Sequence, residues 1–239
     1  MRIQTIRCLE DNFSYLIINE KNLDTYVIDP GESKPIEREI NKQNLKLKYI
    51  LNTHHHADHV GGNIELKNKF KCSIVAFEKD KKIIPGVDIF IKDREKWHEN
   101  NFKFELLHVP GHTVNHVCFY FKELNALFTG DTLFSLGCGR IFEGTNKQMF
   151  ESLNLIKSLP KETMIYFGHE YTMQNSKFCK LHDKSNTNLI KMINKIITKL
   201  NKGLDTTPTK LEDEIYCNIF LKTNSFEKFS KLRQLKDNF

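Results

Sequence analysis

The sequence lacks the features that mark membrane and exported proteins. No run approaches the roughly 20 consecutive apolar residues that a membrane-spanning helix requires, which argues against a membrane protein. The first residues, Met1–Cys8, contain neither an apolar segment nor an Arg/Ser-rich extension of the kind that export and organelle signals carry. Internal repeats and low-complexity tracts are also missing. We therefore expect a soluble protein of the cytoplasm.

Cysteine pairs of the CxxC type are absent as well. The six cysteines lie far apart along the chain, at positions 8, 72, 118, 138, 179 and 217. Since no export signal is visible, we expect reduced and mostly buried thiols and not a disulfide framework. The same spacing argues against a zinc ribbon, so any metal site must be built from histidine and carboxylate side chains.

The composition is that of a folded, mildly basic protein. The chain has 239 residues, of which 39% are hydrophobic and 18 are phenylalanine; this is too apolar for a disordered chain and enough for one large domain, or a core domain with a smaller partner. The net charge of +6 arises entirely after residue 172: residues 173–239 hold 13 Lys and Arg against 7 Asp and Glu, while residues 1–172 hold 23 of each. No basic arm and no interleaving of basic and aromatic residues accompanies this surplus, so a nucleic-acid partner is not expected.

Short apolar segments bounded by turn residues predict strands through most of the chain. They are rich in β-branched and aromatic residues, and they span residues 14–18, 25–29, 48–53, 72–77, 104–109, 116–121, 126–129 and 163–167. Helical patterns lie between them at 34–44, 60–69 and 146–158. Strands with interspersed helices predict sheets that pack together with helices outside.

After residue 171 the pattern changes to helix, and we place a domain boundary near residue 172. Apolar residues recur at helical spacing over 189–200, with Asn186 or Thr187 as the cap. The segment Thr209–Glu212 has the form of a capping box that opens another helix. A last helix is expected from about Ser225 to Lys236.

A histidine-rich segment carries the strongest chemical signal. Thr53–Gly62 reads THHHADHVGG and follows an apolar strand directly. His54 and His56, two residues apart on extended backbone, project to the same side, close enough to bind one metal ion. Asp58 and His59 follow where the chain turns into a helix, and they add a carboxylate and an imidazole, ligands that suit Zn²⁺ and also Fe or Mn. A surface histidine cluster or an affinity tag is the alternative, but a tag would be terminal, would contain no Asp and would not follow a buried strand.

Three single residues repeat the pattern of a metal ligand at the end of a strand. His112 follows a predicted strand in a Pro-Gly turn, Asp131 follows Gly130, and His169 follows Gly168. Any one of them alone would more often be a hydrogen-bonding residue than a ligand. Together with the histidine-rich segment they provide five histidines and two aspartates, enough for two metal sites that share one carboxylate.

These motifs resemble the metallo-β-lactamase superfamily and, within it, the glyoxalase II (hydroxyacylglutathione hydrolase) family. The superfamily pattern THxHxDH matches Thr53–His59. The family patterns match PGHT at 110–113, FTGDTLF at 128–134, GCGR at 137–140 and GHEYT at 168–172. The resemblance covers essentially the whole chain. It implies an α+β fold: a four-layer αββα sandwich over residues 1–172 that holds a dinuclear metal site, followed by a small helical substrate-binding domain over residues 173–239.

The resemblance also implies a role for each candidate ligand. By position, the first metal ion would be held by His54, His56 and His112, the second by Asp58, His59 and His169, and Asp131 would bridge the two. We expect two divalent ions, zinc first, with iron or manganese as alternatives. His55 and His116 lie in the same motifs and are expected to pack against the ligands, not to bind metal.

The implied reaction is hydrolysis of the thioester of S-(2-hydroxyacyl)glutathione, chiefly S-D-lactoylglutathione, to glutathione and D-lactate, the second step of methylglyoxal detoxification. The nucleophile would be a hydroxide between the metals, because metal ions lower the pKa of bound water from about 15.7 towards 7. Asp58 and Asp131 are the catalytic carboxylates of this scheme, since Asp131 bridges the metals and Asp58 can orient the hydroxide. No side-chain nucleophile is needed.

The family binds the glutathione moiety with basic and tyrosyl groups, and the matching positions here are Arg140, Phe142, Tyr171, Arg233 and Lys236. Arg233 and Lys236 stand three residues apart, so one helical face can present both to the carboxylates of glutathione. Phe142 replaces a common tyrosine, which removes one hydrogen bond worth about 1–2 kcal/mol. Ile219 replaces the proline of the family's Asn-Pro-Phe motif, which alters a turn and not the chemistry.

Two other functions are alternatives to this hydrolase. A persulfide dioxygenase carries the HxHxDH motif too, but it uses a mononuclear iron and normally lacks the helical C-terminal domain. A nucleic-acid processing enzyme would bind RNA with strong salt dependence. The partner expected here is the glutathione thioester, with no nucleic acid and no membrane, and the protein is expected to be a monomer or a weak homo-oligomer.

Overall fold

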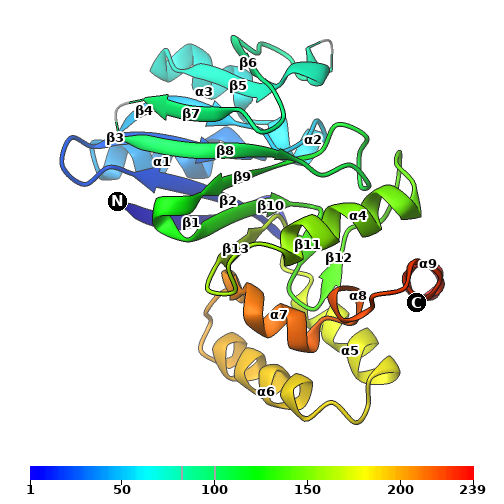
Figure 1. Ribbon diagram of the computed structural model, residues 1–239. Helices are drawn as coiled ribbons and strands as arrows, with labels where there is room; N and C mark the ends of the chain where they lie inside the picture. The colour runs from blue at the N-terminus through cyan, green and yellow to red at the C-terminus, as the bar shows by residue number, and fades with distance from the viewer. Residues whose placement is uncertain (82, 100) are drawn as a thin grey trace. The chain divides into compact units, whose positions relative to one another are not determined.

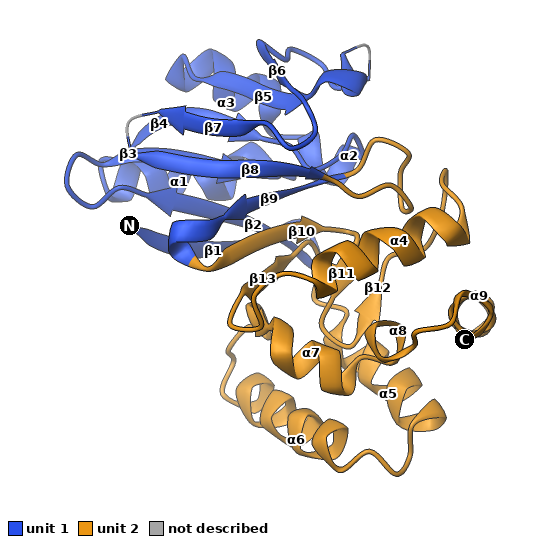
Figure 2. Ribbon diagram, viewed as in Figure 1, with its two compact units in different colours: residues 1–107, 117–124 blue, residues 108–116, 125–239 orange. Residues whose placement is uncertain are grey.

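The computed structural model describes residues 1–81, 83–99 and 101–239. The chain divides into two compact units, coloured separately in Figure 2. Unit 1 consists of Met1–Leu107 and Val117–Leu124, and unit 2 consists of His108–His116 and Asn125–Phe239. Each unit has its own sheet strands and its own apolar core.

Unit 1 contains a six-stranded sheet with the order β1-β2-β3-β4-β5-β6 (Figure 1). The first three strands pair antiparallel, and β3 to β6 pair parallel, as alternating strands and helices require. The strands are β1 (Arg2–Cys8), β2 (Asn12–Ile18), β3 (Asp24–Ile28), β4 (Lys46–Leu51), β5 (Ser73–Phe77) and β6 (Ile89–Ile91). The helices of this part are α1 (Ser33–Lys42), α2 (Ala57–Val60), α3 (Asn63–Phe70) and the short η1 (Glu78–Asp80).

A second layer of unit 1 is formed by β7 (Lys96–Glu99), β8 (Phe102–His108) and β9 (Val117–Phe121), the last followed by η2 (Lys122–Leu124). Aromatic rings join this layer to the first sheet: Tyr26 of β3 stacks on Phe102 with ring centroids 3.8 Å apart. The indole Nε1 of Trp97 donates to the Tyr26 hydroxyl at 3.1 Å. Two sheets therefore pack face to face, as the strand pattern predicts.

Helices α1 and α3 cover the other face of the first sheet. Ile36 and Ile40 of α1 and Leu66 of α3 belong to one buried cluster with Val27 and Ile50 of the sheet. These apolar positions recur at helical spacing in the helices, while β5 is buried on both faces and β4 buries Leu47, Ile50 and Leu51. This burial holds β4 and the start of α2, and thus the histidine-rich segment between them, against a rigid support.

Unit 2 combines a small sheet with most of the helices of the chain. Its strands are β10 (Ala126–Gly130), β11 (Leu133–Phe134), β12 (Gly137–Cys138), β13 (Met164–Phe167) and β14 (Thr209–Lys210). β10 and β13 pair parallel, β13 and β14 antiparallel, and β11 and β12 form a separate hairpin. The helices are α4 (Asn146–Lys157), α5 (Thr172–His182), α6 (Thr187–Asn201), α7 (Leu211–Cys217), α8 (Ile219–Lys222) and α9 (Phe226–Asp237).

The helices of unit 2 begin at side-chain caps and pack through phenylalanine rings. Thr145 and Gln148 form a capping box for α4. Asn186 accepts a hydrogen bond from the Leu189 N–H at the start of α6, which confirms the predicted cap. Phe220 of α8 lies between the rings of Phe178 and Phe229, at centroid distances of 6.1 and 5.9 Å, so that α5, α8 and α9 share a core.

Most predicted elements are confirmed. All eight predicted strands are present with ends that differ by at most two residues, and the helices expected at 34–44, 146–158, 189–200 and 225–236 are also formed. The helix predicted at 60–69 is instead two helices, α2 and α3, separated by Gly61 and Gly62. All six cysteines are free and buried, as expected. Among the described residues, no helix is long and apolar enough to cross a membrane.

The capping box predicted at Thr209–Glu212 is wrong. Thr209 lies in β14, where it pairs with Ile165 of β13, and α7 starts only at Leu211. The Thr209 hydroxyl donates to the side chain of Glu214 at 2.9 Å and not to a helix N-terminus. Pairing with an already formed strand, together with this buried carboxylate, satisfies the groups that a local cap would have used.

Candidate metal and substrate site

The histidine-rich segment of unit 1 lies between β4 and α3. His54 and His56 point to the same side, with His54 Nε2 3.2 Å from His56 Nδ1 and ring centroids 4.7 Å apart, as their spacing predicts. The ring of His59 lies 4.1 Å from that of His54. His54 and His59 are buried, whereas the side chain of Asp58 is 39% exposed. The four predicted ligands of this segment are thus gathered within unit 1.

One buried carboxylate, Asp29 at the end of β3, orients this segment. It accepts hydrogen bonds from the Thr53 N–H at 2.7 Å and from the Thr53 hydroxyl at 2.6 Å, and it lies 3.0 Å from His59 Nδ1. Because a carboxylate only accepts, the proton of His59 resides on Nδ1, and Nε2 keeps its lone pair. The Thr53 hydroxyl, already donating to Asp29, accepts in the same way from His54 Nδ1 at 3.0 Å.

Asp58 is held from another direction. The side-chain amide of Asn12 in β2 donates to Asp58 Oδ2 at 3.0 Å and to the Asp58 carbonyl at 3.1 Å. The backbone beyond Asp58 approaches a neighbouring loop closely, since a Cβ on Gly61 would lie 2.4 Å from the Gly31 carbonyl oxygen. Only glycine permits this approach. Backbone packing and Asn12 therefore fix where the Asp58 carboxylate lies.

In unit 2 the structure brings together His112, Asp131 and His169. Asp131 Oδ2 lies 3.4 Å from His112 Nε2 and 3.3 Å from His169 Nε2, and all three side chains are buried. Asp131 follows β10 and His169 follows β13, and because these strands run parallel, their carboxyl ends meet at one edge. Both distances exceed the roughly 2.7–2.9 Å of a charge-assisted hydrogen bond. One carboxylate oxygen placed between two imidazoles suits a carboxylate that binds metal together with each of them.

Neighbouring groups fix the ring orientations in unit 2. His112 Nδ1 lies 2.7 Å from the carbonyl oxygen of Arg140, which can only accept, so Nε2 is the atom that keeps its lone pair and faces Asp131. The fully buried His116 accepts from the Asp131 N–H at 3.1 Å and contacts the Thr132 hydroxyl at 3.1 Å. His116 therefore supports the loop that carries Asp131, which agrees with its predicted supporting role.

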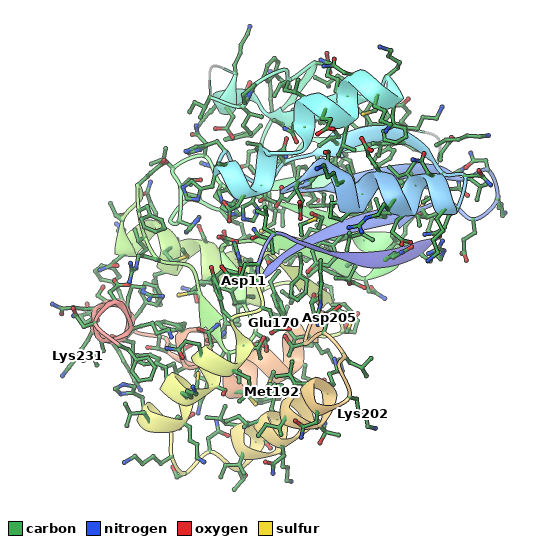
Figure 3. All side chains as sticks on the ribbon, turned by 180° about the vertical axis from the view of Figure 1, so that it is seen from behind. Asp11, Glu170, Met192, Lys202, Asp205 and Lys231 are labelled. Carbon is green, nitrogen blue, oxygen red and sulfur yellow. The ribbon has the colours of Figure 1, made fainter. Side chains whose placement is uncertain are left out.

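The loop after β13 is anchored to the segment that follows α6. Glu170, next to the ligand His169, accepts hydrogen bonds from the Thr206 N–H at 3.0 Å and from the Thr206 hydroxyl at 2.6 Å. Figure 3 labels Glu170 and Asp205 on these two segments. The Tyr171 ring stacks on the His169 ring with centroids 4.7 Å apart and planes 5° from parallel. The anchored loop thus presents an aromatic face beside a predicted ligand.

Three predicted substrate residues lie at the exposed side of these ligands. Phe142 is 61% exposed, and its ring contacts His112 edge to face at 5.3 Å. Tyr171 is 39% exposed. The Arg140 guanidinium is more than half exposed and lies 3.5 Å from Asp237 Oδ1. An aromatic and cationic rim therefore borders the unit 2 ligands, consistent with an anionic ligand that has an apolar part.

The two predicted cations of α9 have different surroundings. Arg233 is only 4% exposed, and its guanidinium donates to the carbonyl oxygens of Cys138 and Gly139 at 2.9 and 3.3 Å. Lys236 is partly buried, with Nζ 5.3 and 5.0 Å from the ring centroids of Phe178 and Phe239. Burial, followed by the nearby Arg233 charge, lowers the pKa of Lys236 from its usual value. The two residues share a helix face, but only Lys236 reaches towards the surface.

Two residues of this region were not expected from the sequence. Asp29 follows a strand in Ile28-Asp-Pro-Gly31, a strand-end position like those of Asp131 and His169 although its glycine comes after it, so a signal for it existed. Glu214 is fully buried in α7 within the run Glu212-Asp-Glu214, which looks like an ordinary acidic helix start. Nothing in its local sequence distinguishes it.

Comparison with known proteins places these residues in a family context. Residues 10–169 match the metallo-beta-lactamase superfamily, and residues 170–239 match the hydroxyacylglutathione hydrolase C-terminus. The hydroxyacylglutathione hydrolase of Pelagibacter ubique (strain HTCC1062) is 56% identical over 239 residues, 100% of both chains.

Solved structures share the fold at low sequence identity. ETHE1 from Myxococcus xanthus aligns with a TM-score of 0.75 and 23% identity over 98% of this chain and 90% of its own. TTHA1623, solved in a di-iron-bound form, aligns with a TM-score of 0.66 and 24% identity over 92% of this chain and 100% of its own. At these identities, the similarity shows the fold alone.

Proposed function

Because the chain belongs to the hydroxyacylglutathione hydrolases of the metallo-β-lactamase superfamily, we propose that it hydrolyses the thioester of S-(2-hydroxyacyl)glutathione, chiefly S-D-lactoylglutathione, to glutathione and D-lactate. The observation that carries this proposal is 56% identity to a hydroxyacylglutathione hydrolase over the full length of both chains. The family and the α+β fold class with C-terminal helices, both expected from the motifs, are confirmed.

The residues fit a divalent metal site. In each unit a histidine donates from Nδ1 to an oxygen acceptor, so its Nε2 lone pair is free to bind a metal ion. Each unit also holds a carboxylate in a defined position. We assign one ion to His54, His56 and His112, the other to Asp58, His59 and His169, and the bridging position to Asp131. Zinc suits this donor set, and iron or manganese would also be accepted. Divalent ions held there would lower the pKa of water towards about 7 and polarise the thioester carbonyl.

The side chains of the site then have to orient the water and supply negative charge, and they need not donate a proton to the leaving group. Asp58, the more exposed of the two catalytic carboxylates, accepts a hydrogen bond from the attacking water and so orients it. Asp131, placed between His112 and His169, would supply negative charge to the metal ions. The leaving group is a thiolate, and because a thiol has a pKa of about 8.5, no side chain has to donate a proton to it.

The rim of unit 2 supports recognition of the glutathione part. We propose that Arg140 and Lys236 pair with its carboxylates, while Tyr171 packs against its backbone. Phe142 lies beside them without the hydroxyl that family members commonly have, so affinity should be about 1–2 kcal/mol weaker unless another donor compensates. Arg233, predicted with this set, contributes through the buried loop backbone that it contacts. In this scheme residues 1–172 supply the metal ligands and residues 173–239 the α9 cations.

The setting of the reaction follows from the thiols and the substrate. Six free, buried cysteines are typical of a reducing compartment, so we propose that the protein acts in the cytoplasm on a glutathione thioester. We propose a monomer or a weak homo-oligomer that binds neither nucleic acid nor membrane. Gel filtration at two salt concentrations, with and without RNA, tests both statements.

Metal analysis coupled to hydrolysis assays tests the function. The purified protein should contain close to two divalent ions per chain and should release glutathione from S-D-lactoylglutathione much faster than it releases coenzyme A from acetyl-CoA. Chelation should abolish turnover, and added zinc should restore it. Oxygen consumption with glutathione persulfide, in the absence of thioester hydrolysis, would show a persulfide dioxygenase instead and overturn the proposal.

A further inference from the structure

Residues 134–140, here called the GCGR loop, are held at both ends by buried charged side chains from distant helices. Glu214 of α7 contacts the start of the loop, and Arg233 of α9 contacts its end. The sequence separation between loop and anchors is 78 residues for Leu136 and Glu214 and 95 residues for Cys138 and Arg233. All of these residues belong to unit 2.

Glu214 is fully buried and accepts four hydrogen bonds. Its donors are the Leu136 N–H at 2.8 Å, the Ser135 hydroxyl at 2.9 Å, the Thr209 hydroxyl at 2.9 Å and the Asn218 amide at 3.2 Å. A buried carboxylate costs free energy unless its oxygens are satisfied in this way. Two of the four donors come from the GCGR loop, so the carboxylate fixes where the loop begins.

Arg233 anchors the other end of the loop. Its Nη1 donates to the carbonyl oxygens of Cys138 and Gly139 at 2.9 and 3.3 Å, and its Nη2 donates to Asp237 Oδ1 at 2.9 Å. The guanidinium also packs over the Phe220 ring at 5.2 Å. A nearly inaccessible guanidinium that donates to backbone carbonyls stabilises the conformation of that backbone. A cation that binds an external ligand would instead be exposed at the surface.

The GCGR loop in turn contacts two predicted metal ligands directly. The Arg140 carbonyl accepts from His112 Nδ1 at 2.7 Å, and the Gly139 N–H donates to the Thr132 carbonyl at 3.2 Å. A Cβ on Gly139 would lie 1.9 Å from the Asp131 carbonyl oxygen, so the two backbones are packed as closely as glycine allows. A shift of the loop therefore moves the His112 ring and the backbone of Asp131.

We propose that Glu214 and Arg233 are positioning residues, which clamp the GCGR loop and thereby hold His112 and Asp131 in the geometry that binds metal. The functional part of this inference rests on the proposed hydrolase activity, whereas the clamp itself does not. The role differs from the direct substrate contact predicted for Arg233, because it requires the backbone contacts that Arg233 makes and no exposure of its side chain.

The reactivity of the Cys138 thiol can report whether the GCGR loop is held in place. It is 5% exposed, and its Sγ lies 3.3 Å from Arg233 Nη1. Burial raises the pKa of this thiol, while the Arg233 charge acts in the opposite direction. Removal of the guanidinium alone would therefore slow alkylation, so faster alkylation of Cys138 in an Arg233 variant reports release of the loop. Cys118, fully buried in β9 of unit 1, is the internal control for global unfolding.

The experiment compares full-length Arg233→Met and Glu214→Ala with wild type. Alkylation of each cysteine by N-ethylmaleimide is followed by peptide mass spectrometry, and metal content, kcat and KM are measured on the same samples. We expect Cys138 to react about 10-fold faster or more in both variants, as in local opening, with Cys118 unchanged, metal retention reduced and kcat lowered more than KM is raised. Matched controls are Lys231→Ala, an exposed residue of α9 that projects from the helix in Figure 3, and Asp213→Asn, an exposed neighbour of Glu214.

Two conservative substitutions keep the proposal testable if Arg233→Met or Glu214→Ala does not fold. Glu214→Gln retains the shape, and the hydroxyls of Ser135 and Thr209 can turn to accept from its amide; it should label like wild type. Arg233→Lys should be intermediate, since a lysine keeps a charged donor for the loop carbonyls but lacks the second nitrogen with which Arg233 donates to Asp237.

Three outcomes would overturn the clamp: unchanged Cys138 labelling, an equal rise for Cys118, or an Arg233→Met variant with raised KM and normal kcat and metal content. Wild type without thioesterase activity would instead refute the proposed function, and the labelling and metal results would still decide the clamp.

Discussion

The predicted metal ligands fall into two halves, one within unit 1 and one within unit 2, and the two halves are built in different ways. In unit 1 the four predicted ligands lie within six consecutive residues, His54–His59, and the single carboxylate of Asp29 contacts His59 and Thr53, the residue just before this stretch. In unit 2 the three ligands come from separate strand ends, and His112 and the Asp131 backbone are oriented by the Arg140 carbonyl of the GCGR loop and by His116. The first half is therefore mainly a property of local sequence, and the second is a property of packing.

The largest expected effect tests whether both halves are needed. His54→Ala in unit 1 and Asp131→Ala in unit 2 should each reduce thioester hydrolysis by about 1000-fold or more, because each removes a ligand on which the proposed site depends. Metal content by mass spectrometry should fall in both. His98→Ala, outside all motifs, is the control. Near-normal turnover in either ligand variant would show that the two halves do not form one catalytic centre.

A second prediction compares the groups that orient the ligands. Asp29→Ala should weaken metal binding by about 10–100-fold, since it releases His59 and the Thr53 backbone together. His116→Ala should have a smaller effect, because the Arg140 carbonyl still fixes His112 in unit 2. Competition with a chromophoric chelator measures both affinities. Equal losses would contradict the view that unit 1 depends on one carboxylate and unit 2 on several weaker contacts.

A third prediction concerns the pH dependence of stability. Burial raises the pKa of Glu214 from 4.5 to about 7, although its hydrogen bonds act in the opposite direction. Because the folded protein then binds the proton more tightly than the unfolded chain does, the contribution of Glu214 is fully present below pH 4.5 and is lost as pH rises through about 7. The loss amounts to about 3 kcal/mol at most.

Urea unfolding of wild type and Glu214→Gln between pH 5 and pH 8 measures this effect. The free energy of unfolding of wild type should decline relative to the variant as pH rises, and Asp213→Asn should follow wild type. Parallel pH curves for wild type and Glu214→Gln would mean that Glu214 is already ionised in the folded protein at the lower pH.

The smallest expected effect concerns the rim of unit 2. Phe142→Tyr restores the hydroxyl that family members commonly have and should lower KM for S-D-lactoylglutathione by several-fold, in line with about 1 kcal/mol for one hydrogen bond. The value of kcat should stay the same, because the contact is remote from the thioester carbonyl. Phe142→Leu is the matched control, and a lowered KM in it would assign the gain to shape and not to the hydroxyl.

The strand-end positions explain why much of the fold and site could be predicted from the sequence. Short apolar segments with turn residues at their ends placed all eight predicted strands, and a ligand-type residue two or three positions after such a strand picked out His112, Asp131 and His169. The failures have specific causes. Thr209 pairs with a distant strand, and α2 and α3 are separate at Gly61–Gly62, where the backbone of residues 30–32 comes too close for a side chain.

The sequence by itself determined the family, the ligand types and the segment His54–His59, because spacing along the chain decides which side chains share one side of a strand or turn. Tertiary structure alone decided the protonated ring atoms of His59 and His112, the burial of Arg233 and the role of Glu214. Each of these depends on partners tens of residues away, and local sequence carries no information about which distant atom will satisfy a buried polar group.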